Sequence, residues 1–454
     1  MWCGTRSSTG RCWRRFGRPL APSAARCWGR PTVRSSGPRG TASSWSTCAR
    51  GPPGKGENCP PGNPPPGPVH ENTFWGISVI RLLHTADLHL DAAFPSLGDR
   101  EEARRDDFLV TFDRLVDLAL EREVDLFLVA GDLFDSWQPS LPAVERVQAG
   151  LQSLVEEGVV PVLLPGTHDC VTTEESVYRK TAFPGAVLLD GPRVDEPAVL
   201  SVRGQDVLLY GFAFRAHASE GALGTMVRRD REALHIGLLH GSRQGSPEWD
   251  YRQKDLPFTM EELRGWELDY LALGHYHNFE ILEEDGRVLG CYPGSPEAKR
   301  FGEEGQRWCA IVSLDGTGAS VERVEVGRRR LEKGTIDLGA CGGQEGVVGA
   351  IDDLASPDLL LRLSLTGIVE TPIETERLLE RCRDGFFHLE IRDRTRMFDS
   401  RFVQQIEEEE TVRGVFVRKV REFMEQIPSN EREEVEAAFR EVLVRFQSFG
   451  GRQA

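Results

Sequence analysis

Apolar residues follow two different periods in the part of the chain that begins at residue 79. Short apolar runs at 79–86, 124–130 and 159–164 predict strands, and apolar residues at helical spacing predict helices at 104–122 and 143–157. The second and third strands are apolar on both faces, which is typical of a parallel sheet covered by helices. The alternation of strand and helix therefore predicts right-handed βαβ units.

Shorter strands are expected after residue 186. Three of them, at 187–189, 198–202 and 207–212, are interpreted as a meander. Two more, at 234–239 and 270–273, each lead to a histidine motif. Further edge and return strands are expected at 281–282, 288–292, 308–314 and 321–326. The sum predicts an α/β fold, a four-layer αββα sandwich over residues 79–327.

Two further segments follow the sandwich. The small α+β cap domain expected over 328–400 is built from a glycine-rich loop at 339–349, a strand at 359–365, a helix at 374–382 and a strand at 386–391. Residues 401–454 are predicted to be helical, with a break at Pro428. Asn430 and Glu433 suit a capping box for the last helix. Its apolar stripe either belongs to the core or docks a partner.

The first 78 residues have a different composition. They hold 11 Lys/Arg and only 2 Asp/Glu, are rich in Arg, Gly, Pro and Ser, and show neither period. Such a segment cannot bury enough apolar surface to order itself, so we interpret 1–78 as a disordered tail or a mis-assigned start. An export signal at Arg14-Arg15 or an organellar transit peptide is the alternative, which the prolines and glycines disfavour.

The net charge is −16, and the acid is concentrated after the basic first segment. This charge argues against nonspecific coating of nucleic acid, but a local basic patch, or metals that neutralise phosphate, would still allow DNA binding. The apolar runs are too short and interrupted to span a membrane. The later cysteines lack Cys-x-x-Cys spacing, which favours reduced thiols in a cytoplasmic protein: Cys170, Cys291, Cys309, Cys341 and Cys382.

Five short motifs with metal-ligand residues stand at the ends of predicted strands. They are Asp87-Leu88-His89, Gly131-Asp132, Gly166-Thr167-His168-Asp169, His240-Gly241 and Gly274-His275-Tyr276-His277. Metal-catalysed hydrolysis of phosphate esters needs carboxylate and imidazole groups that converge from different strands around two divalent cations. The series of motifs therefore predicts a dinuclear metal site.

Two sets of ligands follow from these motifs. One is Asp87, His89, Asp132 and His277, and the other is Asp132, His240, His275 and a neutral group near Thr167. The Asp132 carboxylate has two oxygens and can bridge both cations. A mixed set of nitrogen and oxygen ligands suits Mn, Fe or Zn better than Mg or Ca.

The order of the motifs resembles the calcineurin-like metallophosphoesterases. Four stretches are most similar to the SbcD-type DNA-repair exonucleases and their YhaO-like relatives: HTADLHL at 84–90, AGDLFD at 130–135, GLLHG at 237–241 and YPGSP at 292–296. The resemblance covers about 79–327 and is weak beyond residue 330.

This resemblance implies a DNA-cleaving phosphodiesterase with two metals, preferably Mn, and with Asp132 as the bridging ligand. It implies that a hydroxide between the metals attacks phosphorus in line, and that His168 assists the leaving group rather than binding metal. Asp169 is expected to orient the His168 imidazole. The partners that the resemblance implies are DNA and an SbcC-like SMC-type ATPase. The cap domain would then cover the DNA, and the terminal helices would bind the coiled coil of the ATPase. The protein could also form a homodimer.

One position departs from the family pattern. The third motif normally reads Gly-Asn-His-Asp, and its Asn carbonyl binds the second metal, whereas this chain has Thr167. A hydroxyl is a poorer neutral ligand than an amide oxygen. We therefore expect a second metal site that is weaker or is completed by water.

Other interpretations stay open at this point. A phosphatase or phosphodiesterase acting on nucleotides or phosphoproteins would use the same motifs, and Thr167 leaves room for a non-catalytic scaffold of a repair complex. Asp135 either touches the site or caps the following loop. Basic residues near the motifs either meet DNA phosphates or are ordinary surface charges: Arg243, Arg252, Lys254, Lys299 and Arg300.

Overall fold

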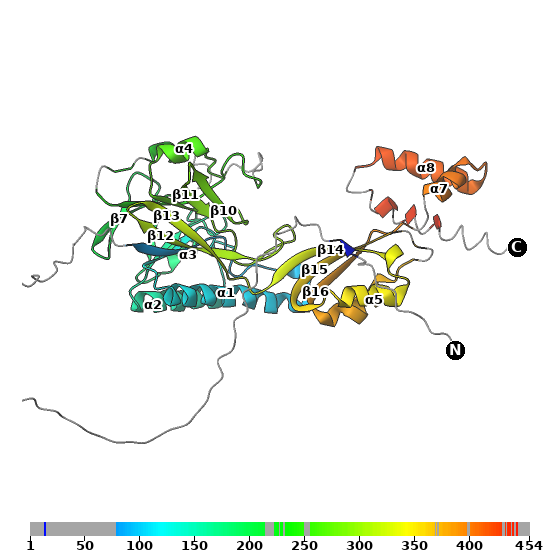
Figure 1. Cartoon of the computed structure of the whole chain (residues 1–454), viewed down its shortest axis with the longest axis horizontal. Coiled ribbons are helices and arrows are strands. Elements are labelled where there is room, and N and C mark those ends of the chain that lie inside the picture. The colour runs from blue at the N-terminus through cyan, green and yellow to red at the C-terminus, as the bar shows by residue number, and fades with distance from the viewer. Residues whose placement is uncertain are drawn as a thin grey trace, which may run out of the picture. The chain divides into compact units, whose positions relative to one another are not determined.

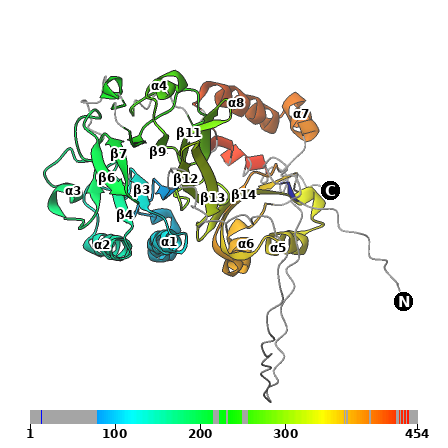
Figure 2. The ribbon, with the colours of Figure 1, turned by 60° about the vertical axis from the view of Figure 1, so that its left-hand side comes forward.

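The structure is a computed structural model, shown as ribbons in Figures 1 and 2. It describes residues 13–14, 79–213, 222–226, 228–229, 232–248, 255–367, 369, 372–396, 400–428, 432, 434–436, 438–439 and 442–443. The segment 1–78, for which a tail was expected, lies outside the described residues except for the short strand β1 (Trp13–Arg14).

The first of two six-stranded sheets has the strand order β13-β12-β2-β3-β4-β5. Its strands are β2 (Ile80–Thr85), β3 (Leu126–Ala130), β4 (Val160–Leu164), β5 (Val187–Leu188), β12 (Trp308–Asp315) and β13 (Gly318–Glu325). Strands β2 to β5 are parallel, and β12 returns antiparallel to β2. The helices α1 (Glu101–Glu121) and α2 (Leu141–Glu156) bury their apolar stripes on this sheet, as the helical spacing predicted.

The second sheet has the order β10-β11-β9-β8-β7-β6. Its strands are β6 (Ala198–Val202), β7 (Gln205–Gly211), β8 (Leu234–His240), β9 (Tyr270–Gly274), β10 (Glu280–Glu284) and β11 (Arg287–Tyr292). Strands β7, β8 and β9 are parallel. The short helix α4 (Met260–Gly265), held by a capping box of Thr259 and Glu262, covers the outer face together with Trp266.

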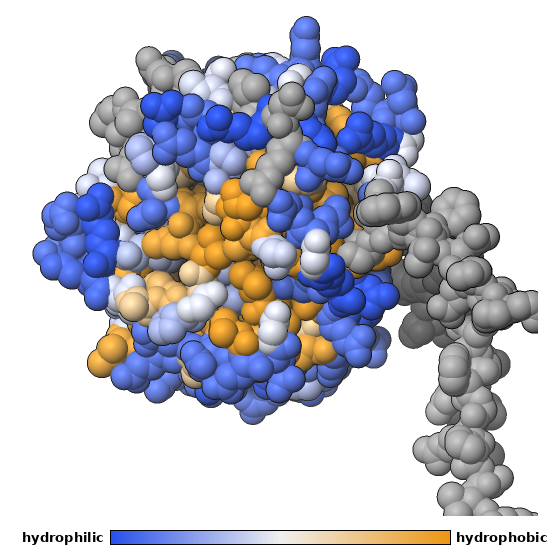
Figure 3. Space-filling model, turned by 90° about the vertical axis from the view of Figure 1, so that its left-hand side faces the viewer, coloured by the Kyte–Doolittle hydropathy of each residue, from blue (hydrophilic) through white to orange (hydrophobic). Residues whose placement is uncertain are grey.

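The two sheets pack on each other through a buried layer that includes Leu82, Leu128, Ile236 and Ala272. The helices α1 and α2 lie on one side of the pair of sheets and α4 on the other (Figure 2). Seen from the left-hand side of Figure 1, apolar residues occupy the middle of the face and hydrophilic residues lie above and below them (Figure 3). The predicted four-layer αββα arrangement is confirmed.

The expected meander at 187–212 is wrong in one respect. Strand β5 pairs parallel with β4 in the first sheet, whereas β6 and β7 form an antiparallel pair at the edge of the second sheet. The chain therefore changes sheets between residues 188 and 198. Apolar periodicity reports which face of a strand is buried, and it does not report which sheet the strand joins.

A third sheet follows residue 329, with β14 (Arg330–Asp337), β15 (Ser356–Thr366) and β16 (Phe386–Asp393) in parallel. Strand β14 was not anticipated, because its charged residues hide the two apolar positions that it buries, Leu331 and Ile336. The helix α5 (Gln344–Asp352) occupies half of the expected glycine-rich loop and packs with α6 (Thr375–Cys382) on the sheet. The glycines are concentrated before the helix starts, and Val347, Val348 and Ile351 give it a buried face.

Two helices, α7 (Ser400–Glu408) and α8 (Val412–Gln426), pack on each other through Ile406 and Val417, with Leu443 beside them. Thr411 caps α8 by accepting a hydrogen bond from the Gly414 N–H. The expected capping box of Asn430 and Glu433 lies outside the described residues. Among the helices that the structure describes, none combines the length and apolarity that crossing a bilayer requires.

The cysteines follow the expectation of reduced thiols with one exception. Cys170, Cys291, Cys309 and Cys382 are free. Cys341 is disulfide-bonded, and none of these four is its partner. Sequence spacing gave no sign of this bond.

A buried charge network joins α1 to the segment that enters β14. The Arg104 guanidinium lies 2.7 Å from Glu297 Oε2 and 3.3 Å from Asp107 Oδ2, and it donates to the Ala298 carbonyl. Asp107 also binds Arg328 and Arg329. Since Arg104, Asp107 and Glu297 are all buried, each charge depends on its partners for compensation.

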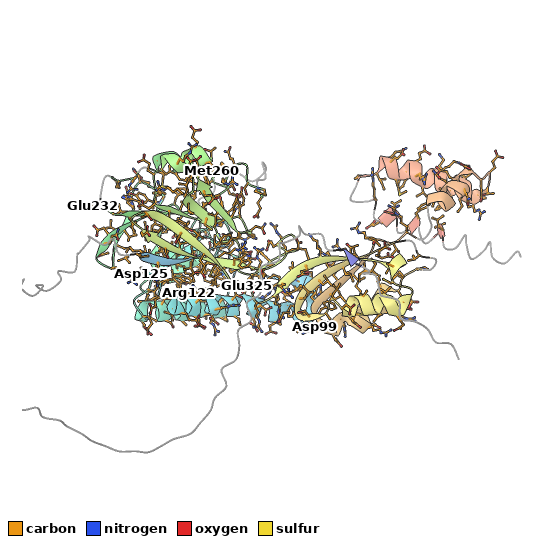
Figure 4. The ribbon with its side chains drawn as sticks, in the orientation of Figure 1. Asp99, Arg122, Asp125, Glu232, Met260 and Glu325 are labelled. Carbon is orange, nitrogen blue, oxygen red and sulfur yellow. The ribbon has the colours of Figure 1, made fainter. Side chains whose placement is uncertain are left out.

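Replacing Arg104 by Met is expected to lower the free energy of unfolding by about 3–5 kcal/mol, because Glu297 is left buried without its cation. Chemical denaturation measures the loss. The control is Arg122→Met at the C-terminal end of the same helix, where Figure 4 labels Arg122. Its pair with Glu322 is exposed and is expected to contribute about 0–1 kcal/mol. Equal effects of the two changes would contradict the assigned role of the network.

Candidate metal centre

The five sequence motifs meet at one edge of the sandwich. Each follows the carboxyl end of a parallel strand: β2, β3 and β4 in the first sheet, and β8 and β9 in the second. Backbone hydrogen bonds from Asp87 N to Gly131 O (3.1 Å) and from His89 N to Asp132 O (3.0 Å) fix the first two motifs side by side. The facing sheets therefore bring residues about 190 positions apart into one site.

The backbone is strained at this edge. Asp87, His89, Asp132 and His275 have positive φ angles of 52°, 45°, 50° and 97°, a region that residues with a Cβ rarely adopt. Gly131 precedes Asp132 with φ 98°, and a Cβ there would collide with the His240 imidazole. Strain of this kind persists where the surrounding structure holds a residue in place, and it is concentrated at functional sites.

One group of donors is formed by Asp87, His89 and His277. The Nε2 atoms of His89 and His277 lie 3.3 Å apart, and His277 Nε2 lies 3.8 Å from Asp87 Oδ1. His277 Nδ1 is engaged at 2.8 Å by Glu303 Oε1, so its Nε2 is the nitrogen that faces the other donors. Two imidazole nitrogens and a carboxylate oxygen at these separations suit one shared cation.

A second group is formed by Asp87, Asp132 and His240. His240 Nδ1 lies 3.0 Å from the Ala130 carbonyl, which fixes the tautomer and directs Nε2 toward Asp132 Oδ2 at 3.3 Å. Within the described residues, this buried Nε2 has no hydrogen-bond partner of acceptable geometry. A fully buried imidazole nitrogen beside a carboxylate oxygen suits a cation that both of them bind.

The electrostatics of the site link these groups. Burial raises the pKa of Asp87, although His240 and His277 oppose the shift. Burial acts in the same direction on Asp132, but His240 and His89 hold the pKa of Asp132 well below its usual range. Burial would lower the pKa of His240, and Asp132 instead raises it to about 10. A bound cation would replace the imidazolium charge, so we expect metal binding to release protons.

His275 and Thr167 are less tightly placed than the other expected ligands. The His275 backbone N–H donates to Asp87 Oδ2 (2.9 Å), and its ring lies edge-on to His240, but neither three-residue donor group above includes it. Its Nε2 lies 3.7 Å from Asp255 Oδ2, a half-buried carboxylate that the sequence gave no reason to select. The Thr167 hydroxyl donates to Asp132 Oδ2 (3.2 Å).

His168 sits at the open side of the site, and its neighbour differs from the expected one. Its Nδ1 lies 3.2 Å from the Asp135 carbonyl and 3.5 Å from Asp135 Oδ1. Asp169 is instead fully buried and accepts hydrogen bonds from Gly166 N, Phe134 N and Tyr178 Oη. Asp169 therefore holds the backbone of the motif, and Asp135 takes the place beside His168 that was expected for Asp169.

Outer carboxylates support the imidazoles. Asp135 Oδ1 lies 3.0 Å from His89 Nδ1 and also pairs with Lys299. Glu303 backs His277 and in addition accepts from the Lys299 backbone N–H (2.7 Å). Burial would raise the pKa of Glu303, but His277 lowers it to about 2. Glu303 was missed because it belongs to no motif and lies 26 residues from the imidazole that it contacts.

The residues present fit a divalent metal centre. The donors are carboxylate oxygens and imidazole nitrogens, and all of them except His168 and His277 are buried. Oxygen atoms behind His240 and His277 set the tautomers of these two imidazoles. The structure gathers the donors in three overlapping groups, each within the distance that one ion requires: Asp87, His89 and His277; His89, Asp132 and His168; and Asp87, Asp132 and His240.

Comparison with known proteins agrees with this geometry. Residues 80–279 match the calcineurin-like phosphoesterase family. The metallophosphoesterase YhaO of Bacillus subtilis, itself uncharacterized, is 28% identical over 283 residues, 61% of this chain and 68% of that protein. The DNA double-strand break repair protein Mre11 of Sulfurisphaera tokodaii is 25% identical over 267 residues, 56% of this chain and 65% of that protein.

A third relative shows how partial these matches are. The Mre11 protein of Methanosarcina mazei is 27% identical over 259 residues, which are 54% of this chain but only 38% of that protein. The matched region thus spans about two thirds of the first two relatives and a smaller part of the third.

The close approach at Gly131 gives a test of the centre. Gly131→Ala is expected to weaken divalent metal binding at least tenfold, because the added Cβ displaces His240. Metal content after dialysis and titration calorimetry measure the loss. Gly349→Ala in α5, where a Cβ meets open space, is the control. Metal binding that survives the Gly131 change would exclude His240 from the centre.

Proposed function

Starting from a calcineurin-like metallophosphoesterase domain at residues 80–279, we propose that the protein is a two-metal phosphodiesterase that cleaves DNA. One observation carries the proposal. Buried carboxylates and imidazoles from both sheets converge at one edge, and among the described residues the buried His240 Nε2 has no hydrogen-bond partner, so it can bind a cation. We assign one metal to Asp87, His89, Asp132 and His277, and the other to Asp132, His240, His275 and Thr167. We take Mn as the metal, because the donor set mixes nitrogen and oxygen.

The two cations, when bound, would supply Lewis-acid stabilisation of the phosphoryl charge and a water of lowered pKa. The protein residues have separate tasks. Asp132 Oδ2 lies 3.3 Å from His240 Nε2 and 4.0 Å from His89 Nε2, so one carboxylate oxygen faces a proposed ligand of each metal. His168 is exposed at the open side and also forms a donor group with His89 and Asp132; we assign to it the task of giving a proton to the leaving oxygen.

Asp135 acts on this reaction as a positioning residue. Its carboxylate and carbonyl oxygens both lie beside His168 Nδ1, which favours a proton on Nδ1 and directs Nε2 outward. The same carboxylate lies 3.0 Å from His89 Nδ1, so it contacts both the proposed general acid, His168, and a proposed metal ligand, His89. We assign to Asp169 the structural task of holding the loop that carries His168.

DNA is the proposed substrate because two of the relatives above are named as DNA double-strand break repair proteins. We further propose an SbcC-like SMC-type ATPase as the partner of the terminal helices. Helix α8 supports this assignment, because it exposes Val412 (82%), Val415 (51%) and Phe423 (52%). These positions share one face of a helix, as a seat for a partner helix requires.

A nuclease assay on duplex DNA with Mn tests the function. His168→Ala is expected to lower kcat by roughly 10²–10⁴-fold with metal content unchanged. Asp132→Ala is expected to lose both activity and metal. Asp113→Ala is the control, since that carboxylate pairs with Arg146 at the surface. Hydrolysis of small phosphate esters without DNA cleavage would favour a nucleotide or phosphoprotein phosphatase, and an inert, folded, metal-loaded protein would favour a scaffold.

The Thr167 position gives a separate prediction. Thr167→Asn is expected to tighten the weaker of two Mn sites about tenfold, because an amide oxygen is a better neutral ligand than a hydroxyl. Calorimetric titration with Mn resolves the two sites. Thr167→Val, which removes only the hydroxyl next to Asp132, is the matched control. Unchanged affinity at both sites in the Asn variant would refute the idea.

A further inference from the structure

A cavity of about 260 Å³ is lined in part by Lys299, which pairs with Asp135 of the metal centre, and we propose that this cavity holds one unpaired nucleobase of the strand being cleaved. It opens between the 94–104 region, the 298–301 segment and the strands β14 and β15. The inference rests on the proposed function, because it takes DNA as the substrate. It adds a binding site for the base next to the reacting phosphate.

Charge and shape of the lining favour a base with its phosphate at the rim. Four cations line the cavity, Arg104, Lys299, Arg300 and Arg362, and no carboxylate does. Each cation already pairs with a carboxylate, such as Glu390 for Arg362, so its position is fixed and its charge is compensated. Arg300 is 77% exposed and can follow a phosphate at the rim.

The inner walls suit a flat aromatic group. The Arg362 guanidinium lies 3.8 Å from the centre of the Phe301 ring, and Leu97, Leu331 and Leu360 also line the cavity. Stacking on aromatic rings and on guanidinium planes is how proteins hold unpaired bases, and every base has the π-face that it needs. A lining of this kind is therefore tolerant of base identity.

The 298–303 segment is a wall of the cavity and also a support of the metal centre. The Lys299 ammonium pairs with Asp135, which contacts both His89 and His168. The Lys299 N–H donates to Glu303, whose other oxygen holds His277. A strand with one phosphate at the cations would thus have its neighbouring nucleotide next to this wall.

The volume limits what can enter. It falls slightly below the roughly 300–1,000 Å³ of drug-sized ligand pockets, a size that suits a single base. A base of a duplex must leave its pair before it can occupy the cavity alone. Opening of this kind is least costly at frayed or mismatched ends.

Fluorescence of 2-aminopurine tests the site, because stacking quenches this base. The full chain, carrying His168→Ala to keep the strand intact, is titrated with DNA oligonucleotides that place 2-aminopurine at successive positions. Quenching at one position is expected. Arg362→Ala is expected to abolish that quenching and to raise the Kd by roughly five- to hundredfold, the effect of losing one stacked base.

Arg392→Ala is the matched control. Arg392 and Arg362 bind the two oxygens of the same Glu390 carboxylate, at 2.7 Å and 2.6 Å, but only Arg362 lines the cavity. The control is expected to keep both quenching and affinity. Absence of quenching at every position, or equal effects of the two arginine changes, would overturn the proposal.

Hydrolysis of a small chromogenic phosphodiester, with His168 intact, separates this proposal from the proposed function. Arg362→Ala is expected to leave its kcat/KM unchanged, since the small ester does not reach the cavity. A loss of kcat/KM that matches the loss of DNA affinity would show that Arg362 supports the fold, and it would contradict the proposed base site. Ester hydrolysis by a wild-type protein that neither binds nor cuts DNA would overturn both proposals, whereas DNA cleavage without quenching would overturn the base site alone.

Discussion

The burial of two carboxylates, Asp87 and Asp132, between the two sheets is the constraint on which the site depends. A buried charge is tolerated only where an opposite charge or several hydrogen bonds compensate it. Here the compensation comes from imidazoles of both sheets, so the sheets must face each other at the ends of β2, β3, β8 and β9. Positive φ angles at the ligands and a glycine against His240 are local results of that requirement.

A second layer of contacts keeps the imidazoles in place. Asp135, the Ala130 carbonyl and Glu303 each engage the ring nitrogen that points away from the centre. The Ala130 carbonyl belongs to β3, whereas Asp135 and Glu303 lie in the loops that follow β3 and β11. Supporting contacts of this kind are how a functional site keeps its geometry. His275 is the exception, because its nearest outer carboxylate, Asp255, lies at 3.7 Å.

The sequence was sufficient to predict the features that depend on local periodicity and on short motifs. The apolar runs of β3 and β4 predicted a parallel sheet, and the motifs named the carboxylate and imidazole residues that the structure gathers at one edge. It failed where the answer depends on contacts between distant residues. Half of the residues in β14 are charged, and the apolar periodicity of β5 and β6 does not show that these strands join different sheets. Asp169 stands next to His168 in the chain, but only the fold shows that its carboxylate turns to Gly166 and Tyr178.

Glu303 contacts both the proposed ligand His277 and the backbone of Lys299. Thermodynamic linkage then requires reciprocity: if occupancy of the neighbouring cavity moves this carboxylate, nucleotide affinity and cation affinity change by the same factor. One side chain would then couple the two places, so that the rate at which the metals exchange depends on whether a nucleotide occupies the cavity.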